Sequence, residues 1–113
     1  PKPETFFSFT NPEKAIIEYW LAFMKGYEKL GLFRLEIEQN DIEINCKITD
    51  CTYANMFIQL DCPELSNLVR EMEQEALEFM CSSSNIEVIM IIGYSGSAEI
   101  TLRNQLVTKA KAS

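Results

Sequence analysis

Four cysteines are the residues of this chain best suited to covalent chemistry, and the chain has no histidine to assist them. They are Cys46, Cys51, Cys62 and Cys81. The lack of histidine excludes Ser-His-Asp and Cys-His nucleophile pairs, an imidazole general base and every zinc site that needs a histidine ligand. A thiolate can still act as a nucleophile beside a cation or a helix N-terminus. Cys51, where a helix is predicted to begin, is the best candidate, although a buried, unreactive thiol is the commoner role.

A row of glutamates on the predicted helix 64–81 is the second candidate for chemistry. The row comprises Glu71, Glu73, Glu75 and Glu78. Carboxylates of this kind bind hard metal ions or form acid/base pairs, but catalytic pairs need a pocket that separates their pKa values. Because these side chains lie largely on the wet side of the helix, we expect a solvated face, with no metal site and no cofactor.

The segment 93–96, Gly-Tyr-Ser-Gly, has the GxxG spacing with which KH domains clamp an RNA backbone. Here it lies between two predicted strands and lacks basic neighbours, so a hairpin turn is the better interpretation. Neither a Lys-Ser/Thr pair nor a helix follows it, which excludes a phosphate-binding loop. The net charge of −7 also disfavours binding to nucleic acid.

A long helix is predicted to position the aromatic side chains near the N-terminus. Asn11 and Pro12 indicate its start, with Asn11 as the cap, and Gly31 indicates its end after about Leu30. Apolar residues recur along it at helical spacing: Ile16, Ile17, Trp20, Leu21, Phe23, Met24, Tyr27 and Leu30. We therefore expect a heavily buried core helix, and a ligand pocket lined by its aromatic side chains is the alternative.

The middle of the chain predicts a β-hairpin followed by two helices. From residue 33 to 48, apolar and polar residues alternate about a tip at Asn40 and Asp41, so Cys46 should point inward. Thr49 or Asp50 is expected to cap a short helix over 51–60. The helix over 64–81 should turn one apolar face to the core. That face comprises Leu65, Leu68, Val69, Met72, Ala76, Phe79 and Met80.

Two further strands complete the predicted fold. The segment 86–92 is apolar on both faces in its second half, as expected of an interior strand, and 98–102 alternates. The 113 residues hold one core. We predict a single α+β domain over 11–104, in the order α-β-β-α-α-β-β, with an antiparallel sheet and helices packed on one face. Residues 1–10 are expected to form an extension and 105–113 a tail.

Cysteine spacing and hydropathy indicate the compartment. The cysteines form no CxxC pair, which fits reduced thiols in a soluble cytoplasmic protein. No segment has the apolar length of a membrane span. Pro1 stands where an initiating methionine is usual, so we expect a processed end or a longer natural chain.

The negative charge is concentrated in the middle of the chain. Residues 1–33 have no net charge, residues 34–87 carry −9 and residues 88–113 carry +2. Such a surface keeps a small domain in solution or binds a basic partner. For the second role, an acidic inhibitor or immunity-type protein that blocks a basic enzyme, the candidate residues are Glu36, Glu38, Glu43, Glu71 and Glu75.

The run Ile-Thr-Asp-Cys-Thr-Tyr-Ala at 48–54, with Cys-Pro-Glu-Leu at 62–65 and the long helix after it, resembles 4-vinyl reductase and amino-thiazoline carboxylate hydrolase-like domains. The element order is also similar to the α/β plait that these domains share with vesicle-tethering subunits and haem-nitric-oxide sensors. The resemblance implies a dimerising domain that encloses a small or lipid-like ligand, with Cys51 at the family's cysteine. Because the helix cysteine of the hydrolase-like members is missing, it implies a degenerate, non-catalytic relative.

We therefore expect a non-enzymatic α+β domain that binds a small apolar ligand or a protein partner, a second copy of the chain included. The expected ligand-binding residues are Trp20, Phe23, Tyr27, Cys51, Tyr53 and Phe57. The acidic inhibitor is the alternative. A cysteine-dependent hydrolase is the third hypothesis, and its catalytic residue would be Cys51.

Overall fold

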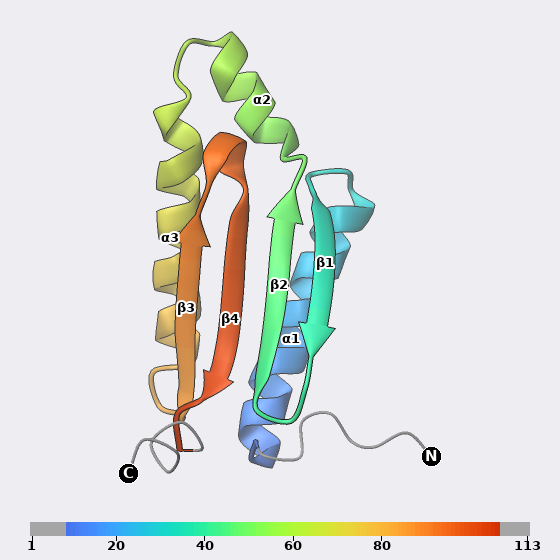
Figure 1. Ribbon diagram of the computed structural model, residues 1–113, viewed down its shortest axis with the longest axis vertical. Helices are drawn as coiled ribbons and strands as arrows, with labels where there is room; N and C mark the ends of the chain where they lie inside the picture. The colour runs from blue at the N-terminus through green and yellow to red at the C-terminus, as the bar shows by residue number, and fades with distance from the viewer. Residues whose placement is uncertain (1–8, 107–113) are drawn as a thin grey trace.

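A four-stranded antiparallel sheet, in the order β1-β2-β4-β3, carries the helices on one of its faces (Figure 1). The computed structural model describes residues 9–106. The elements are α1 (Asn11–Lys29), β1 (Arg34–Gln39), β2 (Glu43–Thr49), α2 (Thr52–Gln59), α3 (Glu64–Met80), β3 (Ile86–Ile92), the 3₁₀ turn η1 (Tyr94–Gly96) and β4 (Ala98–Asn104). The predicted α+β class, element order and antiparallel sheet with helices on one face are confirmed.

The N-cap of helix α1 lies one residue before the predicted cap. Thr10, not Asn11, is the N-cap: its hydroxyl accepts a hydrogen bond from the Glu13 N–H, and a Glu13 carboxylate oxygen accepts one from the Thr10 N–H. Phe9 is buried in the core. Two residues of the predicted extension thus belong to the fold, while residues 1–8 and, in the predicted tail, 107–113 lie outside the described residues. Gly31, at φ +79°, ends the helix as predicted.

The hairpin of β1 and β2 forms as the alternation predicts. The Asn40 side chain accepts hydrogen bonds from the N–H groups of Ile42 and Glu43, which closes the turn. Cys46 points inward and is fully buried, and this burial raises the pKa of its thiol to about 12. The predicted cap of α2 is wrong. Asp50 adopts φ +52° in the turn before the helix, so Cys51 occupies the N-cap position without a side-chain hydrogen bond.

Strand β3 lies at the edge of the sheet, so its predicted interior position is wrong. The turn at residues 93–97 is confirmed as a hairpin, and it returns β4 to pair with both β3 and β2. Ile91 on β3 is 63% exposed. Hydrophobic content does not specify which strand lies next to which, because that choice depends on pairing between segments far apart in sequence.

The two long helices bury less of their apolar surface than predicted. On α1, the buried residues are Glu13, Ile17, Trp20, Leu21 and Met24, while Phe23, Tyr27 and Leu30 are exposed. On α3, the buried residues are Ser66, Arg70 and Leu77, while Leu65, Leu68, Met72, Phe79 and Met80 are exposed. The sheet covers only one side of each helix. Buried hydrogen bonds of Arg70 to Gly96 and Cys51 fix the rotation of α3 about its axis.

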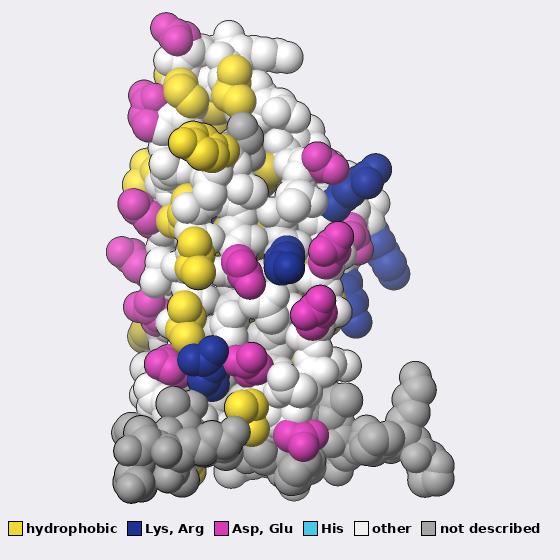
Figure 2. Space-filling model, viewed as in Figure 1, with side chains coloured by type: hydrophobic (Ala, Val, Ile, Leu, Met, Phe, Trp, Pro, Cys, Tyr) yellow, Lys and Arg dark blue, Asp and Glu magenta, His cyan; other side chains and the backbone are white. Residues whose placement is uncertain are grey.

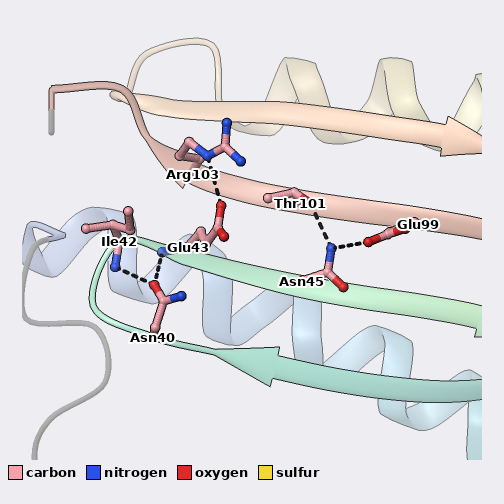
Figure 3. A network of polar contacts seen from close by, with 7 residues as sticks. All are labelled: Asn40, Ile42, Glu43, Asn45, Glu99, Thr101 and Arg103. Carbon is pink, nitrogen blue, oxygen red and sulfur yellow. Dashed lines mark hydrogen bonds and ion pairs between the residues drawn. The ribbon is translucent and has the colours of Figure 1, made fainter. Parts of the chain in front are cut away.

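The sheet face turned away from the helices carries acidic and basic side chains of mixed sign over β1, β2 and β4, and apolar side chains along β3 (Figure 2). The Arg103 Nε donates to the Glu43 carboxylate at 2.8 Å, and the Asn45 amide donates to Glu99 and Thr101, each at 2.9 Å (Figure 3). These cross-strand contacts join β2 to β4. Among the residues described, no helix is both long and apolar enough to cross a membrane.

Candidate functional site

An apolar groove lies between α1 and α3, on the helix-covered face of the sheet. Its volume is about 340 Å³. The lining residues come from α1, the segment before β1, α2, α3 and the sheet: Trp20, Phe23, Met24, Tyr27, Leu32, Phe33, Tyr53, Val69, Glu73, Ala76, Leu77, Met80, Met90 and Ile100. Concave, mostly apolar sites with a few convergent polar groups are the usual form of a small-molecule pocket, and this volume is at the lower end of their range.

The groove exists because the two helices lie over opposite sides of the sheet. Helix α1 contacts β1, and α3 contacts β3. Between them, Met90 of β3 and Ile100 of β4 contribute to the sheet side of the groove. Phe23 and Tyr27 form the α1 wall; their rings lie 6.3 Å apart. The exposed aromatic residues of α1 therefore contribute a wall to a concave surface.

Glu73 is the charged residue among those that line the groove, and protein donors orient its carboxylate. The Tyr53 hydroxyl donates to Glu73 Oε1 at 3.3 Å, and Arg70 Nη1 donates to Oε2. Burial raises the pKa of Tyr53, and the nearby negative charge of Glu73 raises it further. Tyr53 is therefore a neutral phenol at physiological pH and remains a donor to Glu73. Each carboxylate oxygen retains a lone pair for another donor.

Arg70, behind Glu73, is fully buried and holds this polar end in place. Its Nε donates to the carbonyl oxygen of Gly96 at 2.7 Å, and its Nη2 donates to Cys51 Sγ at 3.4 Å. The guanidinium carbon lies 5.3 Å from the ring centroid of Tyr53 and 5.7 Å from that of Phe33. A buried charge is tolerated where such partners satisfy it. Arg70 was not among the predicted site residues, and Glu73 was named only in the glutamate row that was expected to be a solvated face; Glu73 is instead partly buried.

Four of the six predicted ligand residues line the groove, namely Trp20, Phe23, Tyr27 and Tyr53. Phe57 lies beside it, with its ring centroid 6.1 Å from that of Tyr53. Cys51 is 2% exposed and does not line the groove. Gly96 packs so closely on it that an added Cβ would lie 3.2 Å from its Sγ. The sulfur that a hydrolase would need is therefore enclosed by protein.

The predicted acidic partner residues divide between two layers. Glu36, Glu38 and Glu43 alternate with the inward residues of β1 and β2, so they lie on the open sheet face. Glu71 and Glu75 are exposed on α3, in the helical layer on the other side. No single flat contact can cover all five. Within residues 9–106, no group of three or more cysteine and carboxylate side chains is placed to hold a metal ion.

The signal for Arg70 and Glu73 is present in the sequence. Ser66, Arg70, Glu73 and Leu77 recur at helical spacing, and Arg70 is the lone basic residue in the helix 64–80. A lone basic residue in a helical row that also contains the apolar Leu77 is a candidate for burial. The neighbouring apolar row on the same helix is longer, however, and it dominates the hydrophobic pattern.

Comparisons with protein-family models, with curated proteins and with solved structures find no match for this chain. The resemblance to 4-vinyl reductase-like domains therefore stays a prediction from the sequence.

Proposed function

We propose that this domain is a non-enzymatic binding module for a small, mostly apolar molecule that carries one hydroxyl or amino group. The main support for this proposal is the groove of about 340 Å³, whose aromatic and aliphatic walls surround one oriented carboxylate, that of Glu73. The walls suit a ring system, since Trp20, Phe23 and Tyr27 are among them. Glu73 is an acceptor, so the ligand should supply the donor.

Two features favour binding over catalysis. Hydrogen bonds from Arg70 and Tyr53 hold the Glu73 carboxylate in one orientation, which suits a fixed hydrogen-bond acceptor for a ligand. Cys51 lies outside the lining of the groove, so a bound molecule would not contact the nucleophile that the hydrolase hypothesis requires. The acidic inhibitor has less support because its five glutamates lie on two opposite layers.

The test compares 2-naphthol with naphthalene, which has the same ring system and no donor, by calorimetric titration of the purified domain. We expect 2-naphthol to bind roughly tenfold or more tightly, because a hydrogen bond to a charged group contributes about 1.5–3 kcal/mol. Glu73→Gln should reduce this preference, and Glu75→Gln, on an exposed position of the same helix, should leave it unchanged. Equal binding of both probes in the wild-type domain would contradict the role of Glu73.

A second variant tests the groove itself. Ala76 lines the groove from α3, so Ala76→Phe should fill it and abolish binding of both probes while the circular dichroism spectrum stays that of the folded domain. Chemical shift changes in ¹⁵N-resolved NMR spectra should concentrate at Tyr53, Glu73 and Met80. If the probes bind Ala76→Phe as tightly as the wild type, the site lies elsewhere and the proposal is wrong.

A further inference from the structure

Helix α1 has a second apolar face, directed away from the core. Tyr19 is 61% exposed, Phe23 47% and Leu30 76%. Ala15 and Ala22 are exposed as well. An exposed apolar stripe of this size on one helix is typical of a surface that packs against another protein.

Large and small residues are interspersed along this outer face. Ala15, Tyr19, Ala22, Gly26 and Leu30 follow one another at intervals of three or four residues, which is the spacing of a helix–helix seam. A hollow of about 350 Å³ lies at Ala22 and Gly26, between the side chains of Tyr19, Phe23, Tyr27 and Leu30. The face thus presents protruding side chains beside a depression that could receive them.

We propose that this face binds a second copy of the chain, with the two α1 helices packed antiparallel about a two-fold axis that passes between Ala22 and Phe23. In this register Tyr19 lies opposite the partner's Gly26, and both copies of Ala22 and of Phe23 lie next to the axis. Ala15 lies opposite the partner's Leu30. Tyr19 and Leu30 therefore each meet a small residue, both copies of Phe23 flank the axis, and the contact is isologous, as a two-fold dimer requires.

The charges beside the seam fit the antiparallel direction. Glu18, Lys25 and Lys29 lie along one edge of the outer face, with the acid nearer the N-terminus. Antiparallel packing brings Glu18 toward the partner's Lys25 and the partner's Lys29. Parallel packing, about a two-fold axis along the helices, would place the two copies of this edge on opposite sides of the seam, where Glu18 meets neither lysine.

The balance of charge also favours α1 over α3 as the dimer contact. Helix α1 has three acidic and three basic residues, whereas α3, which also exposes apolar side chains, has five acidic residues and one basic residue. Two copies of a chain of charge −7 meet with the least repulsion where the surface is neutral. Dimer formation through α1 does not require the proposed ligand, although Phe23 and Tyr27 border both the groove and the outer hollow.

Sedimentation velocity over a concentration series tests the surface. We expect the wild-type chain to form a dimer of twice 13.0 kDa as concentration rises. Gly26→Arg should remain monomeric and folded, because a Cβ at Gly26 meets no atom within 4 Å in the monomer and arginine is a good helix former. Asn55→Arg, at an exposed site on α2, adds the same charge and should dimerise normally. A wild-type chain that is monomeric throughout, or a Gly26→Arg chain that dimerises like the wild type, overturns the proposal.

Cysteine cross-linking under mild oxidation, in a Cys62→Ser background, tests the register. Ala22→Cys should form a disulfide-linked dimer, because both copies of residue 22 lie next to the axis. Ala15→Cys should not link to itself, since its two copies would lie about 22 Å apart along the seam at 1.5 Å per residue. A mixture of Ala15→Cys and Leu30→Cys should link. Self-linking of Ala15→Cys, or failure of Ala22→Cys to link, overturns the antiparallel register.

Discussion

Two buried charged side chains, Glu13 and Arg70, each join segments that are distant in sequence. One carboxylate oxygen of Glu13 accepts from the Thr10 N–H and the other from the Asn85 N–H at 2.8 Å, so Glu13 ties the start of α1 to the loop before β3. Arg70 ties α3 to Gly96 in η1 and to Cys51. Buried polar groups that are cut off from water need hydrogen-bond partners within the protein. These two side chains therefore specify which segments pack together, and they also contribute to stability.

Glu13 should make the domain sensitive to acid. Burial alone raises the pKa of Glu13, but the hydrogen bonds from Thr10 and Asn85 outweigh it and hold the pKa below the ordinary value of 4.5. A lowered folded-state pKa contributes stability that is fully present above 4.5 and is lost as pH falls through the lower, folded-state value. Glu13→Gln removes one acceptor and should reduce the free energy of unfolding at neutral pH by about 1–3 kcal/mol. Urea unfolding should show this difference shrink below pH 4.5; a constant difference would contradict it.

The cysteines should differ sharply in reactivity. Cys62 is partly exposed, whereas Cys46, Cys51 and Cys81 are buried. Burial raises the pKa of Cys81 to about 11, and the nearby Glu13 carboxylate adds to this. Iodoacetamide at neutral pH should therefore label Cys62 first in the folded protein and the other three only after unfolding, as peptide mass spectrometry would show. Rapid labelling of Cys51 in the folded domain would instead favour the cysteine-hydrolase hypothesis.

At the scale of elements, the turn between β3 and β4 is held against the start of α2. Gly96 has φ +74°, and a Cβ there would lie 2.8 Å from the Ala54 Cβ. The second glycine of the GxxG segment thus serves close packing, and its carbonyl oxygen accepts from Arg70. A turn residue, a helix start and a buried cation form one structural unit.

Two Gly→Ala substitutions should have opposite effects on stability. Gly96→Ala combines left-handed strain of about 1–2 kcal/mol with overpacking of about 1–3 kcal/mol, so the free energy of unfolding should fall by roughly 2–5 kcal/mol. Gly26→Ala, inside α1 where a Cβ meets no atom within 4 Å, should stabilise the domain by about 0.5–1 kcal/mol. Thermal unfolding by circular dichroism measures both. Equal effects at the two positions would rule out this account of Gly96.

At the scale of the whole molecule, charge is unevenly distributed over the two layers. The open sheet face mixes signs and forms cross-strand contacts such as that between Arg103 and Glu43. The exposed side of α3 is acidic and apolar, and α1 is neutral. The net charge of −7 therefore leaves uncompensated repulsion in the folded state.

Salt should relieve this repulsion. Sodium chloride screens charges over about 10 Å at 0.1 M, so the melting temperature should rise between low and moderate salt. Lys47→Glu, at an exposed position of β2, makes the net charge more negative and should steepen the dependence. Differential scanning fluorimetry measures the slopes. A melting temperature that falls with added sodium chloride would mean that attractive ion pairs outweigh the net repulsion.

The sequence by itself determined the elements and the overall class. Period-2 alternation with Asn40 at the tip specified the hairpin, and Gly31 specified the end of α1, because these signals depend on residues close together in the chain. Large apolar side chains at helical spacing must pack against some other surface, so four lining residues of the groove could be predicted: Trp20, Phe23, Tyr27 and Tyr53.

Only the tertiary structure decided which apolar face each helix buries and which strand occupies the centre. Helix α3 carries a longer apolar row than the face it buries, and the partners of Arg70, contributed by α2 and η1, select the rotation. β4 lies inside the sheet because it also pairs with β2, whose residues lie 50 to 60 positions earlier in the chain. The groove follows from these choices, since burial of Arg70 orients Glu73 and exposure of Phe23 and Tyr27 forms the opposite wall. Long-range contacts of this kind leave no local pattern in the sequence.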